Sequence, residues 1–256
     1  MKLTLLGCGN STGVPIIQCK CKVCLSINPK NRRLRCSAWI EVNNKSFLID
    51  TSPDLRQQAL RADIQKIDAV LYTHPHADHI QGIDELRCYN FIQNHKIQAF
   101  GNSWTCQELK SKFSYIFSSK KVEGGGVPQI NLNLIDTSTP FFIAADESII
   151  PIKLFHGSKE SVGYRIGSIA YLTDCSKIPT ESKERLQGLS VLILDCLKLE
   201  KHPTHFNLEQ ALETIEELKP KTTYLTHLSH ELDYEEDSKK LPKGVSFAYD
   251  GLVVNE

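Results

Sequence analysis

The chain has 256 residues, 41% of them hydrophobic, which is enough to bury a substantial core and argues against a disordered protein. Thirty basic residues balance thirty acidic ones, which argues against a protein that holds long nucleic acid on a basic face. No apolar run approaches the ~20 residues of a membrane-spanning helix, and the segment before the first glycine turn is too short for a signal peptide.

The first half of the chain alternates apolar stretches with turn residues, which predicts short strands followed by helices. Ser52 is expected to cap a helix that has Pro53 at its first position. The expected elements, in chain order, are the strand Leu3–Leu6, the glycine-rich loop Gly7–Gly13, the strands Cys36–Val42 and Ser46–Asp50 joined by the turn Asn43–Lys45, the helix Pro53–Ala62, the strands Asp68–Tyr72 and Lys96–Phe100, the helix Trp104–Phe117 and the turn Gly124–Gly126.

The second half of the chain again alternates predicted strands with predicted helices. We expect strands at Ser148–Phe155, Ser161–Ile166, Ser168–Thr173 and Val191–Asp195, the amphipathic helix Leu208–Leu218, and the strand Thr222–Thr226. No linker or low-complexity stretch divides the chain. Two halves that each carry a sheet and helices predict an α/β fold of four layers, helix–sheet–sheet–helix.

Four metal-binding side chains follow the predicted strand Asp68–Tyr72 within six residues. His74 and His76 lie two apart, so on extended backbone their imidazoles are on the same side. Asp78 and His79 come next, where the loop should turn into a helix. These ligands divide naturally between two adjacent metals, and the alternative is a histidine-rich surface loop.

A site for two metals needs further ligands, including a carboxylate that bridges the ions. Three candidates each follow an apolar strand: His156, Asp174 and His227. Because strand ends are where a rigid scaffold meets solvent, all three can converge on one rim, although any one alone is more often a surface or capping residue. His95 has no place near these motifs and is expected at the surface.

Three cysteines within six residues form a second cluster, Cys19, Cys21 and Cys24. Three thiolates and one histidine are typical of a structural zinc site, and His230, three residues past His227, is the best fourth ligand. The alternative is a redox pair of Cys21 and Cys24. Nine cysteines without a secretion signal indicate a reducing compartment, so we expect a cytoplasmic protein. Most of the remaining thiols should be small buried hydrophobes: Cys8, Cys36, Cys88, Cys106, Cys175 and Cys196.

The His-x-His-x-Asp-His run resembles the metallo-β-lactamase superfamily. Within it, the chain is similar to the PhnP-type cyclic-phosphate phosphodiesterases, and the likeness runs nearly end to end. It is carried by Gly7-x-Gly9-x-Ser11/Thr12-Gly13-Val14-Pro15, the cysteine cluster, Ile49–Arg56, Gly163–Ile166, Leu172–Asp174 and Leu225–His230. The resemblance implies the metallo-β-lactamase αββα four-layer sandwich, with residues 1–256 as a single hydrolase domain.

The resemblance also implies a role for each candidate residue. It assigns one metal to His74, His76 and His156, the other to Asp78, His79 and His227, and the bridging position to Asp174. His205 would donate a proton to the leaving group, with His202 as the fallback, so His205 and the metal ligand Asp78 are the predicted catalytic residues. It assigns the structural zinc to Cys19, Cys21, Cys24 and His230. It further implies a pair of manganese ions, with zinc or iron possible, and a homodimer.

These features together predict a binuclear phosphodiesterase that hydrolyses a small diester such as a cyclic ribose phosphate or cyclic nucleotide. Two ions roughly 3.5–4 Å apart would activate water for attack on phosphorus. The leading rival is a tRNA 3′-end processing endonuclease of the same superfamily, although the chain shows neither an RNA-docking arm nor a His-Glu-Ala-Thr segment. A thioester hydrolase, a β-lactamase and a non-catalytic PqqB-like protein are further alternatives.

Overall fold

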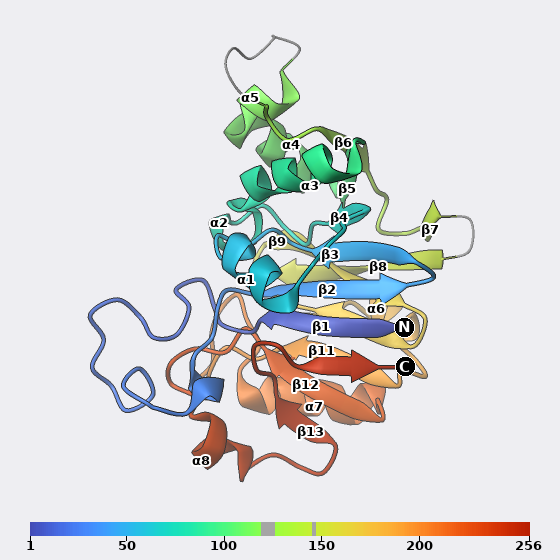
Figure 1. Ribbon diagram of the computed structural model, residues 1–256. Coiled ribbons are helices and arrows are strands. Elements are labelled where there is room, and N and C mark those ends of the chain that lie inside the picture. Colours follow the sequence, from blue (N-terminus) through green and yellow to red (C-terminus); the bar gives the residue numbers. More distant parts are fainter. Residues whose placement is uncertain (119–125, 145–146) are drawn as a thin grey trace.

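The computed structural model describes residues 1–118, 126–144 and 147–256 (Figure 1). Within these residues the strands form two sheets of seven. The first sheet has the order β14-β1-β2-β3-β4-β5-β6, and its strands are β1 (Lys2–Gly7), β2 (Ser37–Val42), β3 (Lys45–Ile49), β4 (Ala69–Leu71), β5 (Ile97–Gly101), β6 (Ile130–Leu134) and β14 (Val253–Asn255). The pairs from β14 to β3 are antiparallel, and those from β3 to β6 are parallel.

The second sheet is mixed in the same way. Its order is β13-β12-β11-β10-β9-β8-β7, and its strands are β7 (Phe141–Ala144), β8 (Glu147–His156), β9 (Lys159–Ile166), β10 (Ile169–Leu172), β11 (Val191–Asp195), β12 (Thr222–Thr226) and β13 (Val245–Phe247). The pairs from β7 to β10 are antiparallel and those from β10 to β13 are parallel. Each sheet therefore has a parallel half whose strands end at a common edge.

The helices are short, and none in the described part of the chain combines the length and apolar character needed to span a membrane. They are the 3-10 turns η1 (Pro29–Asn31) and η2 (Ile83–Glu85) and the α-helices α1 (Leu55–Ala62), α2 (Ala77–Ile80), α3 (Leu86–Gln93), α4 (Ser103–Lys112), α5 (Ser114–Phe117), α6 (Thr180–Glu184), α7 (Leu208–Leu218) and α8 (Tyr234–Ser238).

The side chains along each strand point alternately to the two faces of its sheet, and this alternation produces the four layers. On β3, Phe47 and Ile49 pack between the two sheets, whereas Leu48 faces the helices of the first sheet. On β11, Ile193 points between the sheets and Leu194 faces the helices of the second. Because successive side chains point to opposite faces, each strand buries one side against the other sheet and one against helices. The predicted four-layer α/β sandwich is confirmed.

Most predicted elements are confirmed to within one or two residues, but two helices differ. The first helix begins at Leu55 rather than at Pro53, because the Ser52 hydroxyl accepts from the Asp54 N–H and donates to Gln58 instead of capping a longer helix. The helix expected over Trp104–Phe117 is interrupted at Phe113, whose backbone leaves the helical region. Of the predicted glycine turn, Gly124 and Gly125 lie outside the described residues.

The two ends of the strands differ in character. The terminal ammonium of Met1 donates to the carbonyl of Glu256 at 2.8 Å, and both termini lie together at one end of the sheets (Figure 1). The long loop between β1 and β2 extends from the opposite end, beside α8. At that opposite end the parallel strands of both sheets finish, and the chemistry-bearing residues follow them.

Candidate metal centres

Seven side chains that are distant in sequence meet where the strands of both sheets end. They follow β4, close β8, or stand directly after β10 and β12: His74, His76, Asp78, His79, His156, Asp174 and His227. All seven belong to the set expected from the sequence. Strand ends hold side chains in fixed positions, so the sheets preorganise the group before any ligand binds.

One group of three consists of histidines. The ring centroids of His74 and His76 are 4.6 Å apart, and that of His156 lies 5.2 Å and 5.1 Å from them. One nitrogen from each ring lies within 4.8 Å of the others, close enough to hold a single ion. His74 and His156 are buried, whereas His76 is exposed and marks the open side of the site.

The second group mixes a carboxylate with imidazoles. Oδ2 of Asp78 is 3.2 Å from Nε2 of His79 and 3.8 Å from Nε2 of His227. The positive φ of 61° at His227 turns the chain directly after β12, which brings this imidazole back over the rim. These three side chains form a second set of possible metal ligands.

Asp174 stands between the two groups. Its Oδ2 is 3.1 Å from Nε2 of His79, and its Oδ1 is 3.6 Å from Nε2 of His74 and 3.5 Å from Nε2 of His227. Burial would raise the pKa of this carboxyl, but the imidazoles of His227, His79 and His74 outweigh it and hold the pKa well below its usual value. The carboxylate is therefore ionised and faces both sets of nitrogens.

These side chains are better suited to bind cations than to form hydrogen bonds with one another. Among the described residues, Nε2 of His79 and both ring nitrogens of His227 are buried and make no well-aligned hydrogen bond, although carboxylate oxygens lie 3.1–3.8 Å away, and bound metal ions would satisfy the two Nε2 atoms. Burial and the neighbouring His79 hold the pKa of His74 well below its usual value, which favours the neutral form that ligates metals. Nitrogen and carboxylate ligands of this kind suit manganese, zinc and iron.

Asp50 fixes one of the ligands from behind and was not among the predicted site residues. Its carboxylate accepts from the Thr73 N–H at 2.8 Å and the Thr73 hydroxyl at 2.7 Å, and lies 2.6 Å from Nδ1 of His79. A carboxylate on Nδ1 turns Nε2 of the same ring toward the centre. Asp50 directly follows β3, the strand beside β4. This position after a strand is the sequence feature from which Asp50 could have been predicted as a site residue.

His205 lies against the centre, as expected of a proton donor. Its ring stacks on that of His227 with centroids 4.5 Å apart, and its Nε2 is 3.9 Å from Oδ1 of Asp174. Nδ1 lies 3.2 Å from Oδ1 of Asp195, a fully buried carboxylate that the sequence reasoning missed although it ends β11. Burial alone would lower the pKa of His205, but Asp195 outweighs it and raises the pKa to about 9.

His202, the fallback donor, is less well placed. Its ring centroid is 5.3 Å from that of His205, and its Nδ1 contacts the hydroxyl of Thr204 at 3.2 Å. The structure gives no direct contact between His202 and Asp174 or Asp195 among the described residues. Position therefore favours His205 over His202.

The cysteine cluster meets its predicted partner. Sγ atoms of Cys19, Cys21 and Cys24 lie 3.3 Å, 3.4 Å and 3.6 Å from Nδ1 of His230. Burial would raise the pKa of Cys21, but the Cys24 N–H and the adjacent thiols lower it to about 6, which favours the thiolate. The set matches a closed tetrahedral zinc site.

Arg33 joins the cysteine loop to the segment that carries His230. Its guanidinium is 1% exposed and donates to the carbonyls of Ser229 at 2.7 Å and Leu232 at 2.8 Å. These carbonyls flank His230 on both sides. The arginine thus holds the fourth ligand in register with the three thiols.

The remaining predictions on single residues are borne out. All nine cysteines are free thiols, and of those outside the cluster only Cys88 is exposed. His95 is exposed and contacts Gln93, its close neighbour in sequence.

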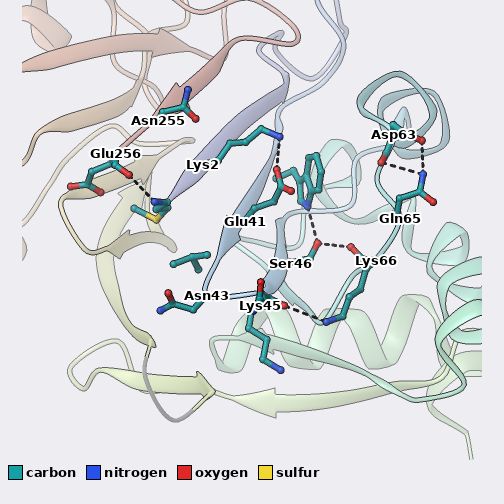
Figure 2. A pocket seen from close by; sticks show the side chains of 14 residues that line it. Lys2, Glu41, Asn43, Lys45, Ser46, Asp63, Gln65, Lys66, Asn255 and Glu256 are labelled. Carbon is teal, nitrogen blue, oxygen red and sulfur yellow. Dashed lines mark hydrogen bonds and ion pairs between the residues drawn. The ribbon is translucent and has the colours of Figure 1, made fainter.

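A surface hollow of about 740 Å³ is lined by no residue of either cluster. Figure 2 shows the side chains that line it. It is lined by the beginning of β1, the turn between β2 and β3, and the residues after α1. Lys2 pairs with Glu41 there at 2.6 Å, and Trp39 donates to the Ser46 hydroxyl at 2.8 Å. Since these are the ends of the strands opposite to the histidines, the hollow is not part of the metal-binding rim.

Comparisons with known proteins agree with this geometry. A family model described as a beta-lactamase superfamily domain matches residues 45–228. The chain is similar to a crystal structure described as a new diphosphatase from the PhnP family, with 43% identity, a TM-score of 0.92, and coverage of 99% of this chain and 96% of that one.

Two further proteins are informative in different ways. An octanoyltransferase of Porphyromonas gingivalis (strain ATCC BAA-308 / W83) is 37% identical over 98% of this chain, but this chain spans only 51% of that protein's length. The structure of zinc-bound PqqB from Methylobacterium extorquens has a TM-score of 0.83 over the full length of both chains, with 19% identity. The second likeness shows a shared fold alone.

Proposed function

The chain belongs to the metallo-β-lactamase superfamily, in its PhnP family of metal-dependent hydrolases, and on this premise we propose that it hydrolyses a small phosphodiester with two metal ions. The observation that carries the proposal is the carboxylate of Asp174, which stands within 3.6 Å of ligand nitrogens from both groups. A carboxylate so placed can bridge two cations, which is the defining need of a binuclear site. The αββα fold expected from the family resemblance is confirmed.

The chain's own residues would hold the ions and align the substrate. His74, His76 and His156 would hold one ion, and Asp78, His79 and His227 the other, with Asp174 shared. Bound divalent ions lower the pKa of water and offset negative charge on phosphoryl oxygens. Asp50 keeps Nε2 of His79 turned toward the centre, and the exposed His76 marks the side from which a substrate enters.

His205 would supply the proton to the departing oxygen. Asp195 accepts only, so Nδ1 of His205 carries a proton toward it and Nε2 of the protonated ring presents a second proton to the centre. A positioned general acid of this kind typically contributes about 10²–10⁴-fold to turnover. The raised pKa favours the protonated form of His205.

The proposed substrates are cyclic ribose phosphates and cyclic nucleotides, with diphosphates added because the PhnP-family relative is described as a diphosphatase. The chain carries no net charge, which does not favour a large nucleic acid substrate. Manganese is proposed for both catalytic positions, with zinc and iron as the alternatives, and the three cysteines and His230 would hold a structural zinc.

The test is a screen of purified protein loaded separately with Mn²⁺, Zn²⁺ or Fe²⁺. Substrates would be a ribose 1,2-cyclic phosphate, 2′,3′-cyclic AMP, bis(4-nitrophenyl) phosphate, a dinucleoside diphosphate and a tRNA precursor. We expect hydrolysis of at least one small ester and none of the tRNA precursor. Cleavage of the tRNA precursor alone would favour the endonuclease alternative, and inactivity with every metal would favour the non-catalytic one.

A second candidate function follows from the Porphyromonas gingivalis octanoyltransferase, of which a chain like this one occupies about half. A centre that activates water can attack an acyl thioester as well as a phosphodiester, so hydrolysis of octanoyl thioesters is the second candidate. Octanoyl-coenzyme A added to the same screen would separate the two, since preferential release of free thiol would replace the phosphodiesterase proposal.

The homodimer and the cytoplasmic location expected from the sequence are still predictions. Light scattering on the eluting protein would measure the mass in solution, and we expect twice that of one chain.

A further inference from the structure

His76 differs from the other histidine ligands in how its ring is held. Nδ1 of three of those ligands contacts an oxygen outside the ligand set: the Thr73 hydroxyl at 3.0 Å from His74, the Asp50 carboxylate at 2.6 Å from His79 and the Thr204 carbonyl at 2.8 Å from His156. Contacts of this kind fix the orientation of a metal-binding ring. Among the described residues, the only hydrogen-bond contact of the His76 ring is with another ligand, Nε2 of His74 at 3.0 Å. The placement of this ring therefore depends more on its backbone.

The backbone is held on both sides of His76. This residue is the N-cap of α2, with extended backbone at φ −71° and ψ 154°, and its side chain makes no capping hydrogen bond. Its carbonyl accepts from the His79 N–H at 3.0 Å. The preceding carbonyl, that of Pro75, accepts from Nζ of Lys112 at 2.8 Å. The peptide that leads into His76 is thus fixed from α4, a helix that supplies none of the seven ligands.

Lys112 is itself held in place. It is the last residue of α4, and its Nζ pairs with Glu108, one turn earlier, at 3.2 Å. On the buried face of the same helix end, Leu109 and Phe113 pack into the core between the first sheet and its helices. Both partners of the ion pair are 40% exposed, so Glu108 and solvent together offset the charge of the ammonium. The segment before His76 therefore receives from Lys112 chiefly a hydrogen bond.

We propose that Lys112 is a positioning residue for the metal ion that His74, His76 and His156 would hold. The proposal rests on the proposed function in one respect, that this group of histidines takes an ion. His76 is the exposed member of the group, so its ring is the one that can turn away into solvent. The bond from Lys112 to the Pro75 carbonyl keeps this ring within reach of the other two, and α4 thereby takes part in metal binding without supplying a ligand.

Metal titration of the whole chain tests this role. Calorimetry would follow Mn²⁺ binding to protein stripped of its catalytic ions, in wild type and in Lys112→Met, whose unbranched side chain has no donor. We expect wild-type protein to bind two catalytic ions per chain. In Lys112→Met one ion should bind about 10–100-fold more weakly, the loss typical of a residue behind a metal ligand, and the other should stay within about 3-fold of wild type.

A double-variant cycle identifies which ion is weakened. His76→Ala removes one ligand of the three-histidine group, so it should weaken the same ion as Lys112→Met, and by more. If Lys112 acts through His76, adding Lys112→Met to His76→Ala should cost no further affinity, because the ring that the lysine positions is already gone. Electron paramagnetic resonance at two equivalents of Mn²⁺ gives an independent signature, since a coupled pair in wild type should be replaced by isolated ions in Lys112→Met.

The helix α4 offers matched controls. Lys112→Arg keeps a charged donor at the same position and should restore most of the lost affinity. Glu108→Gln removes the charge partner but leaves the bond to Pro75, so it should bind both ions nearly as wild type does. Lys110→Met removes an exposed lysine two residues away on the same helix and should have no effect on either ion.

Wild-type affinity for both ions in Lys112→Met would overturn the role of Lys112 and leave the proposed function intact. Equal weakening of both ions, or a loss that adds in full to that of His76→Ala, would overturn it as well, because neither is specific to His76. If wild-type protein binds only one catalytic ion, the binuclear function fails instead. The role of Lys112 is then decided on that single ion, supported if Lys112→Met weakens it and Lys112→Arg restores it, and overturned if Lys112→Met leaves it unchanged.

Discussion

The two ligand clusters are built on different parts of the fold. Every ligand of the histidine and aspartate centre ends or follows a strand, and two buried carboxylates support the centre from behind, Asp50 on His79 and Asp195 on His205. The Cys₃His cluster takes three ligands from a loop, with Cys19 and Cys21 half-buried, and its fourth from the segment after β12. The two sheets fix the histidine and aspartate centre in place, whereas the Cys₃His cluster itself fixes the loop between β1 and β2.

This difference predicts different consequences of losing a metal ion. The sheets keep the histidines in place without help, so an ion at that centre adds chemistry more than structure. The cysteine loop contains little regular structure between β1 and β2, so an ion there would supply much of its order. Substitutions in the first centre should therefore change turnover, and those in the second should change stability.

Asp174→Asn is expected to have the largest effect on turnover. It removes the negative charge that faces both groups of nitrogens, so at least one catalytic ion should be lost while the zinc of the cysteine cluster stays. Residues behind metal ligands are typically worth about 10–100-fold, so turnover should fall by more than that. Metal analysis and initial rates measure both effects.

Asp250→Asn is the control for this variant. Asp250 is also a buried carboxylate, accepting from the Leu34 N–H at 2.9 Å and the Cys8 N–H at 3.1 Å, but it lies outside both clusters. It should lower stability and keep the full metal content. Two catalytic ions retained by Asp174→Asn would contradict the bridging role.

His205→Ala should have the next largest effect, about 10²–10⁴-fold on substrates with an alkoxide leaving group. We expect its metal content to be unchanged, because His205 belongs to neither of the two proposed ligand groups, although one of its ring nitrogens also lies within 4.8 Å of ligand atoms of His156 and Asp174. Esters of 4-nitrophenol need no proton at the leaving oxygen, so the variant should cleave them at rates nearer to wild type. His202→Ala should change either rate far less, and a larger loss in that variant would exchange the two roles.

Asp195→Asn tests the residue behind the proton donor. Asp195 raises the pKa of His205 to about 9, so the protonated form is present below that pH and is lost as pH rises through it. Removing the charge should lower this pKa and move the falling alkaline limb of kcat/KM to lower pH, with a loss of about 10–100-fold near neutrality. A limb that stays in place would mean that another group controls it.

The strands that position the site could be predicted from the sequence because their apolar runs are unbroken. β11 and β12 have the predicted bounds, and so does α7, which is capped by Asn207 at its start and Lys219 at its end. The outer strands were missed for the converse reason. β6 alternates apolar residues with asparagine, a strand pattern weakened by the low strand propensity of asparagine, and β14 is only three residues long, too short to show a pattern.

The candidate site could likewise be predicted only in part from the sequence. The seven ligands were predictable because imidazole and carboxylate groups recur directly after apolar strands. Asp50 and Asp195 occupy the same kind of position, but an aspartate that orients a ligand is indistinguishable in sequence from one that ends a strand.

Cys24→Ser should have the smallest effect on turnover, within about 3-fold, and the clearest effect on stability. It removes one of four ligands from the cluster around His230, so the protein should lose one zinc per chain. Because the loop would lose its main constraint, we expect Tm to fall by about 5–15 °C, taking about 2–4 °C per kcal/mol for a chain of this size. Cys88→Ser, at an exposed thiol outside the cluster, should change neither zinc content nor Tm. If Cys24→Ser instead lost activity as fully as Asp174→Asn while keeping its Tm, the two clusters would act as one centre and the division between chemistry and structure would be wrong.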